Sequence, residues 1–197
     1  MKEAPMTDAI QTENLVESSL RESWALFKDD LVLYLVATLL VFVISAVTLG
    51  ICAGPMIVGF IQLVRKRMRS QEGTATDVFD GFSEFGASLI AMILIGFGVF
   101  IGSMLLVLPG LIFGFITAFT FHAIALDGLG ATSAIGQSYA LIKENLAPSF
   151  ALLLIVAVLN AIGGSIIFGS LLATPFSLIV MTIAYQRLRG ATHADSI

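Results

Sequence analysis

Residues 85–126 read FGASLIAMILIGFGVFIGSMLLVLPGLIFGFITAFTFHAIAL, and these 42 residues contain no Asp, Glu, Lys or Arg. A membrane-spanning helix needs about 20 mostly apolar residues, so this tract is long enough for two spans. Two further tracts without charge lie on either side of it, at residues 31–64 and 145–186. The tract at residues 145–186 is as long as residues 85–126, whereas residues 31–64 allow only two short helices.

The composition agrees with a membrane protein. Apolar residues make up 57% of the 197 residues, charged residues only 12%, and the mean hydropathy is +0.98. A soluble domain of this size could not bury so much apolar surface. One Cys and 18 Gly without a regular period exclude a disulfide scaffold and a collagen-like chain. The sequence therefore predicts an all-α, polytopic membrane protein.

Each uncharged tract has helix-breaking residues near its middle. Gly frees the backbone, and Pro cannot continue a helix without losing a hydrogen bond. We therefore expect three helical hairpins, at about residues 31–64, 85–126 and 145–186, with six transmembrane helices in all. The expected breaks are the segment Gly50 to Pro55, the pair Pro109-Gly110, and the group Gly163-Gly164, Gly169 and Thr174-Pro175.

The alternative is three single long spans, and the placement of the ten Lys and Arg residues separates the two arrangements. With three hairpins all ten lie on one side of the membrane, whereas with three single spans they divide four to six. Short loops rich in Lys and Arg stay in the cytoplasm. We therefore expect a multi-pass protein of the inner (plasma) membrane with both termini cytoplasmic. The polar, acidic start also predicts no cleavable signal peptide.

The expected domain organisation is simple. Residues 1–12 would form a disordered acidic tail, residues 13–190 a single membrane domain, and residues 191–197 a polar tail. Amphipathic segments precede the first and third hairpins. The apolar stripe of each segment would face either lipid headgroups or the protein's own surface, and the periodicity of the sequence is compatible with both. The stripes are Val16, Leu20, Trp24 and Phe27 in the first segment, and Ile135, Tyr139, Ile142 and Leu146 in the second.

An internal repeat supports the three hairpins. Residues 23–31 (SWALFKDDL) align with residues 138–146 (SYALIKENL), and both stretches come directly before a hydrophobic hairpin. The middle hairpin follows a short aromatic segment, VFDGFSEF at residues 78–85, which matches less well. The sequence thus predicts one unit used about three times: a lead-in segment, a span, a Gly/Pro turn and a second span.

Several short motifs resemble a known group of proteins. They are DVFDGF at residues 77–82, LPGLI at 108–112, ALDG at 125–128 and AIGQSYALIK at 134–143. Their order is similar to that in a broad group of prokaryotic six-span integral membrane proteins with no established activity. This group includes the membrane domain fused to some glycerophosphodiester phosphodiesterases. The resemblance implies a six-span helical domain; it transfers no catalytic role, because this sequence has no phosphodiesterase domain.

Two sets of residues are candidates for a functional role. A dense basic run follows the first hairpin and, with Trp24, could contact lipid headgroups; the simpler interpretation is a topology anchor. Polar side chains inside the tracts could contact neighbouring helices or line a polar pathway. The candidate headgroup contacts are Arg65, Lys66, Arg67, Arg69 and Trp24, and the candidate intramembrane contacts are Gln62, His122 and Asn160.

The sequence contains no recognisable catalytic, cofactor or metal motif. It lacks a phosphate-binding loop, a nucleophile elbow and a zinc-protease signature. His122 and His193 have no second ligand placed to hold a metal. We therefore expect a non-catalytic protein without cofactor that acts as a scaffold, a partner-binding protein or a lipid-organising module. Its partners would be the bilayer and a membrane protein or second copy, not nucleic acid; the alternative is a transporter or permease for an apolar or lipid-like solute.

Overall fold

Helices account for all the regular secondary structure in the computed structural model, which describes residues 4–165 and 167–194 and the side chains of residues 12–165 and 169–190. The all-α prediction is therefore confirmed for these residues. In chain order the elements are α1 (Ala4–Asp29), α2 (Leu31–Val47), α3 (Ala53–Met68), the 3-10 helix η1 (Ala75–Glu84), α4 (Phe85–Leu105), α5 (Val107–Ile116), α6 (Thr120–Asp127), α7 (Ala131–Glu144), α8 (Leu146–Gly164) and α9 (Ile167–Ala194).

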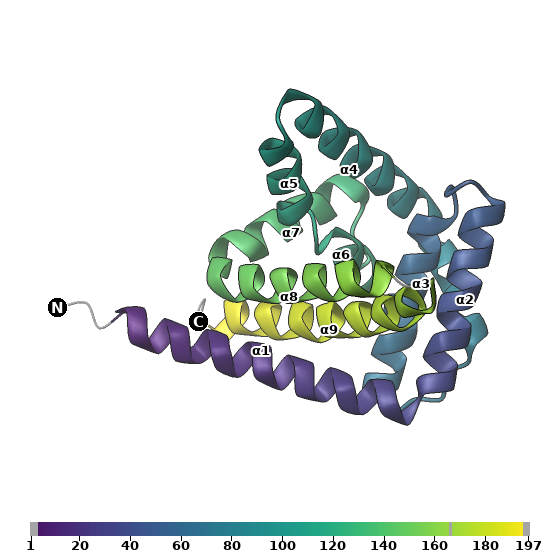
Figure 1. Ribbon diagram of the computed structural model, residues 1–197, viewed down its shortest axis with the longest axis horizontal. Helices are drawn as coiled ribbons and strands as arrows, with labels where there is room; N and C mark the ends of the chain where they lie inside the picture. The colour runs from purple at the N-terminus through teal and green to yellow at the C-terminus, as the bar shows by residue number, and fades with distance from the viewer. Residues whose placement is uncertain (1–3, 166, 195–197) are drawn as a thin grey trace.

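Helix α1 lies beside the α8–α9 hairpin and runs antiparallel to α9 (Figure 1). Its apolar stripe packs on protein: Val16 and Leu20 contact a buried cluster of Leu152, Val180 and Ala184. Of the two partners that the sequence left open for this stripe, Val16, Leu20 and Phe27 contact the protein's own surface, whereas Trp24 stays 52% exposed. Helix α1 begins at Ala4, so the structure places helix within residues 4–12, which the sequence predicts to be disordered. Helix propagation costs little once a longer docked helix has formed.

The junction between α1 and α2 is a sharp bend of 91° at Asp30. Asp30 has φ −123° and ψ 34°, and its amide and carbonyl still join the two helices through hydrogen bonds to Leu26 and Tyr34. Asn145, between α7 and α8, has φ −123° and ψ 49° and the same pattern of hydrogen bonds. Glu84, between η1 and α4, is similar at φ −104° and ψ 25°. The residue before each hairpin thus has similar dihedral angles, and the chain bends sharply at Asp30, whereas η1 continues into α4 as one helix.

The first hairpin is short. Its two helices contain 17 and 16 residues, which gives α2 a length of about 25 Å against a hydrocarbon core of about 30 Å. The turn between them includes Leu49 and Gly50 in left-handed conformations, with φ 51° and 86°. Glycine adopts this conformation without a steric penalty. The break therefore lies within the predicted segment, and α3 begins at Ala53, so that Pro55 falls in its first turn.

The second hairpin breaks earlier than the sequence predicts. Helix α4 ends at Leu105, and Leu106 is extended at φ −162° and ψ 145°. Pro109 lies in the first turn of α5, where a missing N–H removes no helical hydrogen bond. Gly110 serves close packing instead, because a Cβ there would lie 2.1 Å from the hydroxyl of Ser103. The predicted break at Pro109-Gly110 is therefore wrong by a few residues.

A second break that the sequence did not predict separates α5 from α6. The chain turns at residues 117–119, and the buried side chain of Ser138 on α7 bonds to both sides of this turn. The Phe119 amide donates to the Ser138 hydroxyl at 3.0 Å, and this hydroxyl donates to the Ile116 carbonyl at 2.8 Å. A buried helix break needs such partners, since unpaired backbone groups are costly. One serine thereby satisfies a backbone group on each side of the turn.

The third hairpin turns after Gly164, as predicted, and then continues through Pro175. Helix α9 contains this proline in its interior, so the expected break at Thr174-Pro175 is wrong. Proline is tolerated in membrane helices because neighbouring groups satisfy the freed carbonyl. Gly163 and Gly169 let α8 and α9 approach closely: a Cβ on Gly169 would lie 2.6 Å from the Gly163 carbonyl oxygen.

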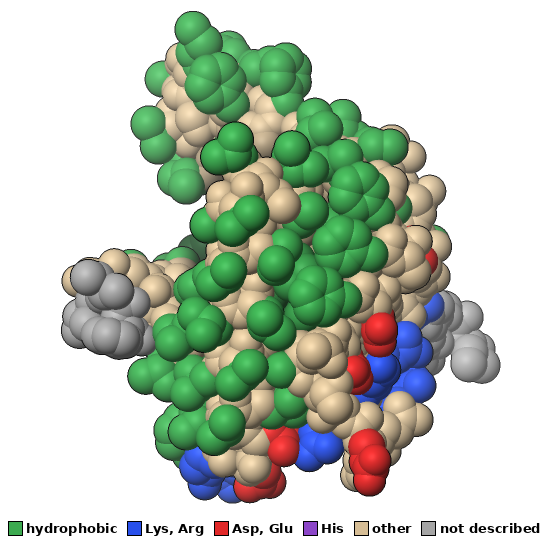
Figure 2. Space-filling view, turned by 90° about the vertical axis from the view of Figure 1, so that its right-hand side faces the viewer, with side chains coloured by type: hydrophobic (Ala, Val, Ile, Leu, Met, Phe, Trp, Pro, Cys, Tyr) green, Lys and Arg blue, Asp and Glu red, His purple; other side chains and the backbone are tan. Residues whose placement is uncertain are grey.

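The described residues form four helices that are long and apolar enough to cross a membrane, or five if the bent pair of α1 and α2 is one span. They cover Ala75–Leu105, Val107–Asp127, Leu146–Gly164 and Gly169–Gly190. Apolar side chains cover most of the face in Figure 2, and charged side chains gather at its lower end. The main buried cluster lies where α3, α6, α7 and α9 meet, and it includes Ile61, Phe119, Leu141 and Tyr185.

Candidate functional site

The basic run at the end of α3 divides into two pairs of residues. Lys66 forms ion pairs with two carboxylates of η1, Asp77 at 2.9 Å and Asp80 at 2.7 Å. Hydrogen bonds from Lys66 to Asp80 and Asp77 hold the pKa of its ammonium group above its usual value. Arg67 forms a two-pronged ion pair with Asp30, at the bend between α1 and α2. These two charges are balanced within the chain and join three elements.

The other two residues, Arg65 and Arg69, have no acidic partner among the described side chains. Arg65 is half-buried and donates to the main-chain carbonyl of Leu126, at the end of α6, at 2.9 Å. Arg69 is exposed, and its guanidinium makes no hydrogen bond or ion pair to any described residue. An arginine presents five N–H donors in a planar fork. Most of the donors of this pair are therefore available to a ligand.

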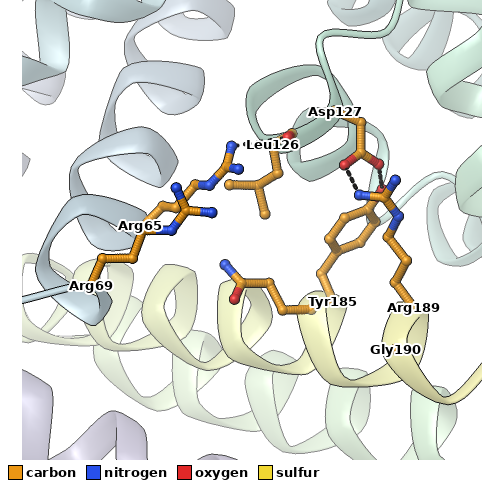
Figure 3. Close-up of a pocket in the computed structure, with 8 residues that line it drawn as sticks. Arg65, Arg69, Leu126, Asp127, Tyr185, Arg189 and Gly190 are labelled. Atoms are coloured by element: carbon orange, nitrogen blue, oxygen red, sulfur yellow. Dashed lines mark hydrogen bonds and ion pairs between the residues drawn. The ribbon is translucent and has the colours of Figure 1, made fainter.

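Arg65 and Arg69 line a hollow of about 300 Å³ that α3, α6 and α9 surround (Figure 3). Both arginines extend from α3 toward the ends of α6 and α9. The wall also contains Leu126, Asp127, Tyr185, Gln186, Arg189 and Gly190. We refer to this space as the arginine hollow.

The far wall of the arginine hollow is a fixed polar group. Asp127 is the last residue of α6, and Gly128 ends that helix in a left-handed conformation at φ 65°. One Asp127 oxygen accepts the Tyr185 hydroxyl at 2.6 Å, and the other pairs with Arg189. The Asp127 side chain is only 6% exposed. Both carboxylate oxygens are thus engaged on the wall, and they hold Arg189 at the edge of the hollow.

A second hollow of similar volume shares Arg65 and Arg69 with the first. Its wall adds Gln62 and Lys66, so the structure brings four of the predicted residues together at one end of α3. Sequence reasoning missed the opposite wall, formed by Asp127, Tyr185, Gln186 and Arg189. The sequence did contain signals for these wall residues, namely the ALDG motif and the arginines that follow the third tract. Nothing in the sequence indicated that α6 and α9 would end beside α3.

His122 is buried in the core beside the arginine hollow and does not line it. Its ring stacks on Tyr185, with centroids 6.0 Å apart, and meets Phe119 edge-on. The imidazole lies near the main-chain carbonyl of Leu178, yet neither nitrogen makes a hydrogen bond of standard geometry to a described residue. The structure places His122 between the rings of Phe119 and Tyr185 and beside the Leu178 carbonyl of α9.

Asn160 lies on α8, in the α8–α9 hairpin. Its amide nitrogen donates to the Val156 carbonyl within α8 at 2.8 Å and to the hydroxyl of Ser177 on α9 at 2.7 Å. This side chain joins two helices. Asn160 and His122 line neither of the two hollows at the end of α3.

Trp24 lies on α1, away from the arginine hollow, and its side chain is 52% exposed. Its ring contacts Phe27 and Phe176, and the ammonium of Lys28 lies 5.7 Å from its ring centroid.

The described residues contain no group of three or more His, Cys, Asp and Glu side chains arranged to hold a metal. His193 falls outside the residues whose side chains are described.

Fold and site together define an all-helical membrane protein with a basic hollow at one end of its helices. The chain belongs to the family described as Domain of unknown function (DUF7847), whose family model matches residues 7–188. No curated protein and no solved structure matches it.

Proposed function

We propose that the protein is a non-catalytic integral membrane protein that organises anionic lipids around the basic ends of α3 and α9. The observation that carries this proposal is the pair Arg65 and Arg69, whose charges no described acid balances. Each Lys or Arg near an anionic membrane surface attracts it by about 1 kcal/mol. By contrast, Lys66 and Arg67 are held by acids of the chain and have little charge left for an external partner.

The proposed architecture is six spans in three hairpins, with α1, η1 and α7 as lead-in segments. The similar dihedral angles at Asp30, Glu84 and Asn145 support a unit used three times. In this arrangement the short α2–α3 hairpin forms two further spans, beyond the four helices that are long enough by themselves. The resemblance to the membrane domain fused to some glycerophosphodiester phosphodiesterases accords with such a fold and lends no catalytic role.

The proposed orientation places the basic end, and both termini, in the cytoplasm of a cell whose inner (plasma) membrane holds the protein. The positive-inside rule supports it, because Lys and Arg lie at the ends of α1, α3, α7 and α9. The alternative function, a permease for an apolar or lipid-like solute, needs a polar pathway through the spans. His122 is packed among rings, and Asn160 is bonded to Ser177, so neither residue favours that alternative.

The proposal is tested by measuring which lipids the protein retains. The purified protein is reconstituted into vesicles of phosphatidylcholine with a minor fraction of phosphatidylglycerol, re-extracted gently, and its bound lipids are quantified by mass spectrometry. We expect phosphatidylglycerol to be enriched over the bulk vesicle, and the double variant Arg65→Gln/Arg69→Gln to lose at least half of that enrichment.

The matched control is Arg21→Gln. Arg21 lies on an exposed face of α1 and pairs only with Glu17 one turn away, so its loss should leave the bound lipids unchanged. A wild-type protein whose retained lipids have the same composition as the vesicle would contradict the proposed function.

A further inference from the structure

We infer that the arginine hollow is a binding site for a phosphomonoester, which is the terminal phosphate of either a lipid headgroup or a small soluble phosphate ester. The inference rests on the proposed function and narrows it from anionic lipids in general to one ligand chemistry at one place.

The donors converge from two helices. Arg65 donates one N–H to the Leu126 carbonyl, and its other donors remain available, as do all the side-chain donors of Arg69. Gln186 on α9 contributes an amide to the same wall. Two guanidinium forks can bind a phosphate through paired N–H···O bonds, which are shorter and stronger than bonds between neutral groups. A terminal phosphate with three free oxygens fits more of these donors than a phosphodiester with two.

The net charge favours the monoester as well. Three arginines, Arg65, Arg69 and Arg189, and one carboxylate, Asp127, line the hollow, so its formal charge is +2. A phosphomonoester has a charge of about −1.5 to −2 at pH 7, which balances that charge. A phosphodiester has a single negative charge and would leave one cation unpaired.

The acid in the wall does not compete for the arginines that face the ligand. Both Asp127 oxygens are engaged, one by the Tyr185 hydroxyl and the other by Arg189. This carboxylate is nearly fully buried, and each of its oxygens already accepts a hydrogen bond from the wall. It fixes Arg189 at the edge as a third cation. The volume of about 300 Å³ is at the lower end of the range for small-molecule sites, about 300–1,000 Å³, and suits a headgroup or a small ester.

The test compares four probes by calorimetry on the purified full-length protein in a neutral detergent. They are dioctanoyl phosphatidic acid, dioctanoyl phosphatidylglycerol, glycerol 3-phosphate and inorganic phosphate. We expect the phosphatidic acid to bind at least about tenfold more tightly than the phosphatidylglycerol, although both have the same chains. Loss of charge-assisted hydrogen bonds in Arg69→Gln should weaken phosphatidic acid binding by about tenfold.

The Arg69 side chain contacts no described partner, so this variant should fold normally, which a thermal unfolding curve checks. Gln186→Ala should weaken binding less, by a few fold, because it removes a neutral donor. Arg21→Gln should bind as the wild type does. Glycerol 3-phosphate that binds as tightly as phosphatidic acid would show a soluble ligand, whereas tenfold weaker binding would show a lipid; both outcomes support a phosphomonoester site.

Equal affinity for the two lipids, or phosphatidic acid binding that Arg69→Gln leaves unchanged, would overturn the inference. Its failure is distinct from that of the proposed function. Enrichment of phosphatidylglycerol in vesicles without a preference for phosphatidic acid would keep the function and remove the site. Tight binding in detergent without lipid enrichment in vesicles would keep the site and remove the function.

Discussion

Gly59 on α3 and Gly81 on η1 lie backbone to backbone, with no room for a side chain between them. A Cβ on Gly81 would lie 2.3 Å from the Gly59 amide nitrogen and 2.1 Å from the Pro55 carbonyl oxygen. A Cβ on Gly59 would lie 1.8 Å from the Val78 carbonyl oxygen. This contact seats η1 on α3, and it places Asp77 and Asp80 of η1 within reach of Lys66.

Gly59→Ala and Gly81→Ala should therefore each destabilise the protein. Both would force backbone atoms apart, and overpacking costs about 1–3 kcal/mol or more when the neighbour is backbone. The temperature of half-unfolding in detergent, followed by size-exclusion chromatography after heating, should fall for both variants.

Gly136→Ala is the matched control for these variants. Gly136 lies inside α7, and an added Cβ would meet nothing within 4 Å. Alanine favours the helix over glycine by about 0.5–1 kcal/mol, so this variant should be as stable as the wild type or more stable. Equal stability of Gly59→Ala and Gly136→Ala would show that η1 does not pack on α3 in this way.

Lys66→Met should destabilise the protein modestly, because it leaves Asp77 and Asp80 without their common cation. Both ion pairs are partly exposed and screened by solvent, so the loss should be below about 1 kcal/mol. The pKa of Lys66 is raised in the folded protein. Its stabilisation is therefore complete below the usual lysine pKa and is lost only as the pH rises through the higher folded value. The difference in unfolding temperature between wild type and variant should be constant from about pH 7 to 9; a difference that vanishes in this range would contradict the assignment.

Asn160 and Ser177 should be energetically coupled across α8 and α9. Their hydrogen bond is 2.7 Å long, and polar bonds between membrane helices are worth about 0.6 kcal/mol on average, up to about 1.7. A double-mutant cycle with Asn160→Leu, Ser177→Ala and the double variant isolates this term from the change in side-chain volume. A coupling energy of zero would mean that the two helices do not meet through these side chains.

His122→Phe should keep or raise the stability of the protein, whereas His122→Gln should lower it. The ring of His122 stacks on Tyr185 and meets Phe119, and neither nitrogen has a standard hydrogen bond among the described residues. Phenylalanine keeps the ring and loses only the contact to the Leu178 carbonyl, and it removes buried polar atoms that cost about 1–3 kcal/mol when they are left unsatisfied. Glutamine loses the stacking and adds an amide that needs partners. Unfolding temperatures in detergent rank the three proteins, and a stable glutamine variant beside an unstable phenylalanine variant would indicate a hidden polar contact.

Composition and the charge map were sufficient to predict the helical class and a chain with several helices apolar enough to cross a membrane, because the cost of burying charge in a membrane is large. They could not predict where each helix ends. Pro109 and Pro175 are strong breakers in water, yet the first lies in a permitted first turn and the second inside a continuous helix. The bend at residues 117–119 depends on Ser138, which lies on another element. A local reading of the sequence contains no information about such a partner.

The site was predictable only in part. The run from Arg65 to Arg69 is visible in the sequence, but which of its members are neutralised depends on tertiary contacts. Arg67 pairs with Asp30, which lies 37 positions earlier, and Lys66 pairs with Asp77 and Asp80, which lie beyond the following loop. The wall formed by Asp127 and Arg189 joins α6 to α9. Sequence spacing shows which residues share a face of one helix, but it does not predict that the ends of α3, α6 and α9 meet.

Cys52 offers a direct test of the proposed topology, because it is the only cysteine of the chain and lies at the α2–α3 turn. The opposite end of this hairpin carries Arg65 to Arg69, so the turn should face the periplasm or exterior if the basic end is cytoplasmic. Leu49 and Ile51 beside it are exposed, at 93% and 53%, and the helices are short. An apolar, exposed turn on a short hairpin suits headgroup depth rather than open water.

A membrane-impermeant maleimide should therefore label Cys52 slowly in intact cells, and inverted vesicles should protect it until detergent is added. A Cys52→Ala variant should remain unlabelled throughout. The matched control adds Glu72→Cys to that variant, since Glu72 is exposed in the loop after α3, at the basic end; this thiol should label in inverted vesicles and not in intact cells. Labelling of Cys52 only in inverted vesicles would reverse the orientation. Protection in both preparations, relieved by detergent, would instead mean that the hairpin enters the bilayer without crossing it, and the six-span proposal would fall to four.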